Sequence, residues 1–143
     1  MQILLDEDVP IQVLQILRRV LKGHDVDHVE AIRWKGKKDV FLIADAATRG
    51  YHLLLTNNRK QLADPRECDA IKKSGMHHVR YDQAPGLRGL ALAVAAIIAA
   101  MPALVEELEQ ESGQRLVRIQ GLRPVRRFEI VDPKKDPPEY WPR

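Results

Sequence analysis

Three acidic residues follow directly after an apolar run near the start of the chain, and they are the strongest candidates for chemistry. Residues 3–5 are apolar and are bounded by polar residues, which predicts a short buried strand. The acids are Asp6, Glu7 and Asp8. Clustered carboxylates repel one another, and hard cations such as Mg²⁺ prefer oxygen ligands. The cluster therefore predicts either a divalent-metal site or, as the simpler alternative, solvated acids with Asp8 capping the next helix.

Strand and helix patterns alternate around these acids and predict an α/β fold. Apolar residues recur at helical spacing over residues 11–22, and Pro10 suits the first turn of that helix. Short strands are predicted at residues 25–29, 53–55 and 76–81, of which the fully apolar 53–55 is typical of a buried parallel strand. In such sheets ligands bind at the carboxyl ends of the strands, which is where the acids stand. Further helices are predicted over residues 39–50, 65–74 and 87–110, with Pro102 kinking or dividing the last one.

The composition limits the classes of function that this chain can have. It has 143 residues and a formal charge of +3, which suits one domain and permits nucleic-acid binding without requiring it. Cys68 is the only cysteine, which excludes an internal disulfide and a thiolate metal cluster. Residues 90–104 are the most apolar stretch but are short for a membrane span, and no signal-type segment precedes the acids. We expect a cytoplasmic protein with no membrane contact, one domain over residues 1–131, and a proline-rich tail over residues 132–143.

A polar loop over residues 31–38 is the first candidate for nucleic-acid contacts. Trp34 lies there among cations, so a base could stack on its indole while the cations hold phosphates. In the alternative interpretation the tryptophan folds back onto the domain. The cations placed to contact phosphate in this loop, or after the strand at 53–55, are Arg33, Lys35, Arg59 and Lys60.

The arginine-rich C-terminal region is the second candidate. Residues 115–120 alternate apolar and polar side chains, which predicts an edge strand, and residues 128–131 could pair back on it as a hairpin. Arg115 and Arg118 are candidate phosphate contacts because the arginine fork suits phosphate. Equally, these charges could protect an exposed sheet edge from pairing with other chains.

The order of these features resembles that of PIN-like domains, the nuclease fold of VapC-type toxins. A small bacterial PIN-like family opens with a Leu-Leu-Asp-Glu-Asn-Leu-Pro-type segment, and this chain reads Leu4-Leu5-Asp6-Glu7-Asp8-Val9-Pro10. The resemblance covers about residues 2–82. It includes Gly23-His24-Asp25-Val26, a helix that opens with Asp39, and an apolar strand that ends in Thr56.

The resemblance implies a three-layer α/β/α fold around a central, mainly parallel sheet. It also implies an acidic pocket that holds one or two Mg²⁺ or Mn²⁺ ions and hydrolyses RNA phosphodiesters. Asp6 and Asp39 are the implied catalytic acids and metal ligands, and Glu7, Asp8 and Asn58 could complete the ligand set. Toxins of this class work beside a small antitoxin protein, and PIN domains commonly form homodimers, so both partners are expected here.

The chain departs from the family pattern after its third strand. The family usually has Thr, any residue, Asp, any residue, Asp and Phe, whereas Asn58 and Lys60 stand at the two Asp positions here. These replacements remove two negative charges and add one positive charge. Because close charges interact by about 4 kcal/mol at an effective dielectric constant of ~20, the change could decide whether a divalent ion stays bound. Lys60 could instead neutralise Asp6 in place of a metal. The acids that could compensate are Asp64, Glu67 and Asp69.

Two other functions share part of this sequence pattern. The chain could be a catalytically inactive PIN-like module that binds RNA or a protein partner. A receiver-like phosphorylation domain also has acids after its first strand, but it needs an aspartate after its third strand. Residues 56–58 supply none.

Overall fold

A parallel sheet whose strands are short and largely buried forms the centre of the molecule. The computed structural model describes residues 1–57, 60–123 and 125–142. Within these residues all strand pairs are parallel, in the order β2-β1-β3-β4-β5. The strands are β1 (Gln2–Leu5), β2 (Asp25–His28), β3 (Leu53–Thr56), β4 (His77–Arg80) and β5 (Leu116–Arg118).

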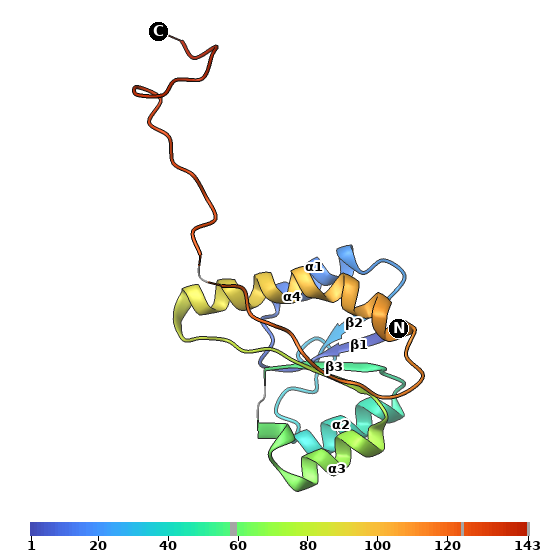
Figure 1. Ribbon diagram of the computed structural model, residues 1–143. Helices are drawn as coiled ribbons and strands as arrows, with labels where there is room; N and C mark the ends of the chain where they lie inside the picture. Colours follow the sequence, from blue (N-terminus) through green and yellow to red (C-terminus); the bar gives the residue numbers. More distant parts are fainter. Residues whose placement is uncertain (58–59, 124, 143) are drawn as a thin grey trace.

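Helices cover both faces of the sheet, so the fold has the three α/β/α layers that the sequence predicts (Figure 1). Because side chains alternate along a strand, Ile3 and Leu5 pack into the cluster formed with α1 and α4, whereas Leu4 packs into the cluster formed with α2 and α3. Both sides of β1 and β3 are therefore apolar, which explains their uninterrupted runs. The helices are α1 (Gln12–Val20), α2 (Asp39–Thr48), α3 (Pro65–Ser74) and α4 (Gly86–Glu109), with a 3₁₀ turn η1 (Lys60–Leu62).

The start of α1 differs from the sequence prediction. Its N-cap is Ile11, and no side chain caps it, so Asp8 does not serve as a helix cap. Pro10 lies before the helix rather than in its first turn, and Val9 is buried beside it. The acids therefore occupy a short turn between β1 and α1, where Val9 donates its amide hydrogen to the Asp6 carbonyl over 3.1 Å.

Helix α4 has the length and composition of a membrane-spanning helix, but it packs as a core helix of a soluble-type α/β domain. One side of it faces α1 and the sheet, through residues such as Ala93, Ile97 and Met101. The helix continues through Pro102, so of the two predicted outcomes, a kink or a division, the division does not occur.

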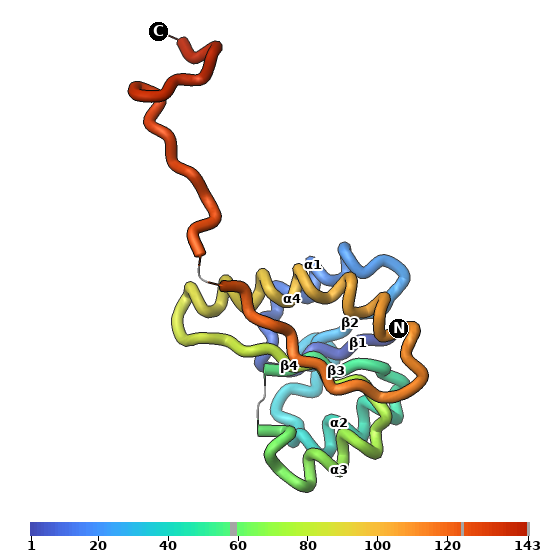
Figure 2. The backbone as a smooth tube through the Cα atoms, in the orientation of Figure 1, coloured from blue at the N-terminus to red at the C-terminus, as the bar shows by residue number. Residues whose placement is uncertain are grey.

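The C-terminal region confirms the edge strand but not the hairpin. β5 lies at the sheet edge and pairs in parallel with β4, with Val117 opposite Val79. Residues 128–131 form no strand, and residues 125–142 run away from the sheet (Figure 2). Among the described residues the outer edge of β5 therefore has no partner strand.

Gly89 lets the start of α4 approach the preceding loop closely. A Cβ at this position would lie 1.8 Å from the Ala84 carbonyl oxygen. Gly89→Ala should therefore lower the free energy of unfolding by about 1–3 kcal/mol, through overpacking against backbone. Urea unfolding followed by circular dichroism measures this change. The matched control Ala95→Gly, on an exposed position of the same helix, should cost about 1 kcal/mol through helix propensity alone. Equal stability of Gly89→Ala and the wild type would contradict the close contact.

Candidate acidic site

Asp6 lies at the point of the sheet where bound ligands are expected. In the strand order β2-β1-β3-β4-β5 the chain reverses its direction of winding between β1 and β3. Ligands of doubly wound sheets bind at the carboxyl ends of the strands beside this switch point. Asp6 directly follows β1 and Thr56 ends β3, so both stand at the switch point.

The Asp6 carboxylate is buried and held by two donors. Its side chain is almost wholly covered, with a relative exposure of 4%. Thr56 Oγ1 donates to Oδ2 over 2.8 Å, and the Glu7 amide donates to Oδ1 over 2.8 Å. Burial raises the pKa of Asp6 to about 6, the two hydrogen bonds oppose that rise, and the charges of Asp8 and Asp39 add to it. The site thus holds a carboxylate that ionises close to neutral pH.

Three further acids interact electrostatically with this position or with one another. Partial burial raises the pKa of Asp8, and the charges of Asp39 and Glu7 raise it further. Partial burial also raises the pKa of Glu67, with Asp39 and Asp64 as further causes. Asp39 is the first residue of α2, so its coupling to Asp6, Asp8 and Glu67 joins acids from the β1 turn, α2 and α3.

Glu67 is the one of the three compensating candidates whose environment suits the site. Its Oε2 atom is buried without a hydrogen-bond partner among the described residues. Asp64, by contrast, is the N-cap of α3 and accepts from the Arg66 and Glu67 amides. Asp69 forms an ion pair with Lys73 at 2.7 Å. Of the three, Glu67 is the acid whose pKa the charge of Asp39 raises, and it lines a hollow together with Asp39.

The donor set fits a hard divalent cation in its chemistry. Mutual repulsion, raised pKa values and the unpartnered Glu67 oxygen would all be relieved by a positive ion. Among residues 1–57, 60–123 and 125–142, however, no three His, Cys, Asp or Glu side chains form a ready ligand group. Mg²⁺ is usually held by one or two carboxylates together with water and substrate phosphates. An open site of this kind does not need three protein ligands.

The turn that carries the acids is tied to both neighbouring parts of the sheet. His28 Nδ1 accepts from the Glu30 amide over 3.0 Å, so Nε2 carries the proton and donates to the Val9 carbonyl over 2.7 Å. On the other side, the Tyr81 hydroxyl donates to the Asp8 carbonyl over 3.3 Å. These side chains follow or end β2 and β4, and sequence reasoning gave neither of them a role. Their burial at strand ends is the signal that could have identified them.

The segment after β3 is described only in part. The predicted ligand Asn58 and the predicted phosphate contact Arg59 lie outside the described residues. Lys60 is exposed and begins η1, and Gln61 is buried beside β4. His78 donates from Nε2 to Gln61 Oε1 over 2.9 Å, and burial lowers the pKa of His78 to about 4. This neutral histidine fixes η1 to the sheet.

The loop before α2 decides between the two interpretations of Trp34. The indole is half-buried, packs edge-on against Tyr51 with ring centroids 6.5 Å apart, and has Lys37 Nζ 4.9 Å from its centroid. Trp34 is therefore folded back onto the domain, with Tyr51 at its ring and Lys37 over it, rather than placed to stack on a base. Arg33 and Lys35 are exposed on the same loop.

The two arginines predicted to contact phosphate lie at opposite ends of β5. Arg118 ends β5 opposite Arg80, at the carboxyl ends of the strands like Asp6, but its Nε and Nη2 donate to Asp82 Oδ2 over 3.1 and 2.6 Å. Arg115 precedes β5 at the amino edge and pairs with Glu111 at 2.5 Å. Arg115 is thus on the side of the sheet away from the acids.

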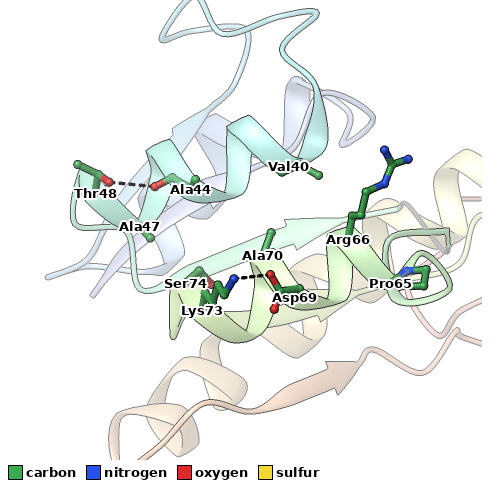
Figure 3. A pocket seen from close by; sticks show the side chains of 10 residues that line it. All are labelled: Val40, Ala44, Ala47, Thr48, Pro65, Arg66, Asp69, Ala70, Lys73 and Ser74. Carbon is green, nitrogen blue, oxygen red and sulfur yellow. Dashed lines mark hydrogen bonds and ion pairs between the residues drawn. The ribbon is translucent and has the colours of Figure 1, made fainter.

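A large hollow lies away from the acids. It has a volume of about 760 Å³ and lies between α2 and α3 (Figure 3). Ala44 and Ala47 line one side, and the polar groups are paired with neighbours, as with Thr48 to the Ala44 carbonyl and Lys73 to Asp69. None of the acids coupled to Asp6 lines this hollow.

Comparisons with protein-family models, with curated proteins and with solved structures found no match to this chain. The likeness to PIN-like domains therefore rests on the opening motif and on the order of the elements.

The burial of Asp6 makes stability depend on pH. Because its pKa in the folded protein is about 6 against 3.8 when exposed, the folded state binds the proton more tightly. Between about pH 4 and pH 7 this group alone should lower the free energy of unfolding by about 3 kcal/mol as pH rises. In EDTA, Asp6→Asn should therefore be more stable than the wild type at pH 7.5 and lose this advantage near pH 4. Chemical denaturation across this range is the measurement, with Glu7→Gln as the control for an exposed neighbouring acid. A difference between Asp6→Asn and wild type that is constant with pH would refute the assignment.

The hydroxyl of Thr56 should tune the same carboxylate. Thr56→Val removes the 2.8 Å donor while keeping the side-chain volume, so the pKa of Asp6 should rise above its wild-type value. The free energy of unfolding at neutral pH should fall by about 1–3 kcal/mol, because a buried acceptor loses its partner. Thr56→Ser should restore both. Titration of the Asp6 carboxyl carbon by NMR gives the answer, and an unchanged pKa in Thr56→Val would show that the bond does not act on the charge.

Proposed function

We propose that this chain is a PIN-like, divalent-metal-dependent ribonuclease that hydrolyses RNA phosphodiester bonds. The observation that supports this function is the position of Asp6, a buried carboxylate with a pKa of about 6 at the switch point of the sheet. The charges of Asp8, in the same turn, and of Asp39, on α2, both act on Asp6. Acids gathered from separate elements at a ligand-binding edge are typical of a site for a cation and its bound phosphate.

In this proposal Asp6 and Asp39 hold a Mg²⁺ or Mn²⁺ ion, with Asp8 and Glu67 beside it. The chemistry that such an ion supplies is a lower pKa for a nearby water and polarisation of a phosphate oxygen. Thr56 and the Glu7 amide orient the Asp6 carboxylate through Oδ2 and Oδ1. Burial raises the pKa of Glu67, and its Oε2 has no hydrogen-bond partner among the described residues, so this carboxylate is the candidate proton acceptor. Glu7 is exposed and contributes its amide rather than its carboxylate to Asp6.

RNA as substrate agrees with the charges around the acids. The exposed cations Arg33 and Lys35 lie on the loop that leads into α2, where Asp39 begins the helix. Their charge offsets the repulsion between the acids and a polyanion. A small antitoxin protein, a homodimer and a cytoplasmic location are further parts of this proposal and come from the resemblance to toxin-type PIN-like proteins.

The decisive experiment is cleavage of a mixed RNA pool with Mn²⁺. Wild-type protein should cleave it, and EDTA should abolish cleavage. Asp6→Asn and Asp39→Asn should each reduce the rate by about 100-fold or more, since a fixed charge that stabilises the transition state is worth several kcal/mol. Asp69→Asn is the matched control, because Asp69 lies on α3 and pairs with Lys73 away from the acids.

Two results would count against the proposed function. Cleavage that survives in Asp6→Asn would indicate a contaminating nuclease. RNA binding without cleavage by a folded wild-type protein would favour the inactive module instead. Lys60→Asp, which restores an acid that the family has, should increase cleavage if charge alone weakens the site.

A further inference from the structure

A second hollow adjoins the acidic site and has a different chemical character. It has a volume of about 550 Å³, within the range of small-molecule sites, and it lies where α2 begins beside α3. Val40 and Arg66 line both this hollow and the larger one between α2 and α3. Its charged and aromatic lining consists of Lys37, Lys38, Asp39, Phe41, Arg66 and Glu67.

Phe41 is the unusual member of this lining. It lies in the first turn of α2, two residues after Asp39, yet its relative exposure is 61%. Of the other large apolar residues of α2, Leu42 and Ile43 are buried in the core, and Val40 is exposed to a smaller extent, at 37%. An aromatic ring that is left in solvent beside a hollow offers a face for stacking, as Trp34 does not.

Two of the three cations in the hollow are available to a ligand. Lys37 is occupied, since it pairs with Asp45 and lies over the Trp34 ring. Lys38 is exposed and has no ion pair within the part of the chain that the structure describes. The Arg66 side chain is 86% exposed and its ion pair with Asp64 is long, at 3.8 Å. Both can therefore turn to a phosphate without breaking a strong contact.

We propose that this hollow binds one unpaired nucleotide of a single-stranded RNA, with its base stacked on Phe41 and its phosphate held by Lys38 and Arg66. The inference rests on the proposed ribonuclease function for the identity of the polymer. Asp39 and Glu67 line the same hollow, so a nucleotide bound there places its neighbouring phosphodiester bond at the acids. The hollow would thereby select single strands, because a base inside a duplex has no free face for Phe41.

The test is binding of a fluorescein-labelled oligouridylate, measured by fluorescence anisotropy in EDTA at low ionic strength. EDTA prevents cleavage, so binding is measured apart from the proposed reaction. Phe41→Ala should weaken binding by about 5-fold or more, the expected loss for one stacked base, and Phe41→Tyr should restore it. Lys38→Ala and Arg66→Ala should each weaken binding and lower the slope of log affinity against log salt by about 1.

Matched controls separate this hollow from general surface effects. Leu87→Ala removes another exposed apolar side chain, and Lys72→Ala removes another exposed cation of α3; both should leave the affinity unchanged. We expect Phe41→Ala to fold, because the Phe41 side chain is exposed and not part of the core. Thermal melting followed by circular dichroism checks this.

The outcomes distinguish the hollow from the ribonuclease. Binding that depends on Phe41, in a protein that does not cleave RNA with Mn²⁺, would support the hollow and overturn the reaction. Cleavage and binding that are both insensitive to Phe41→Ala would overturn the hollow and leave the reaction standing. Absence of measurable binding by the wild type, or equal affinity for the strand annealed to oligoadenylate, would also overturn the hollow.

Discussion

The structure depends on a parallel sheet that is covered by helices on both faces. Because β1 and β3 have no solvent-exposed side, nearly all of their side chains are aliphatic, and polar groups are confined to the strand ends. Thr56 is the last residue of β3, and Asp6 is the first residue after the adjacent buried strand β1. Their hydrogen bond is thus a product of the same burial that stabilises the sheet, and it places a carboxylate where water is scarce.

Such a carboxylate is costly for folding and useful for binding. Removal from water raises the pKa of Asp6, and neighbouring acids raise it further, so the ionised form is less favourable in the folded protein than it is in water. A bound cation would offset this cost, because it interacts favourably with the ionised carboxylate. Sites that work against stability in this way are the usual exception to a well-satisfied interior, and they are commonly functional.

Much of the fold follows from the sequence, because hydrophobic periodicity records which faces are buried. The apolar run that became β3 and the helix predicted over residues 65–74 are confirmed, the latter with Asp64 as its cap and Gly75 as its left-handed end. The parallel partner of β5 could not be predicted, because an edge strand of alternating pattern fits either direction of pairing. The exposed hairpin predicted from residues 128–131 is wrong because alternation alone does not supply a partner strand.

The site is less predictable than the fold because it is assembled from distant residues. The acids of the first turn are contiguous in sequence, and Asp39 follows from the resemblance, but nothing local indicates that Glu67 lines a hollow together with Asp39. That relation depends on how α3 packs against α2. The exposure of Phe41 likewise depends on packing, because it is set by which residues of α2 face the core.

The anchoring of the acidic turn has a consequence for how the protein can change over evolutionary time. His28 and Tyr81 attach this turn to elements on either side of β1, whereas the helix that follows it begins without a side-chain cap. The position of the acids is therefore set by the sheet and is largely independent of the outer surface of α1. Substitutions on that exposed surface can accumulate, and new partners can be acquired there, while the geometry around Asp6 stays the same.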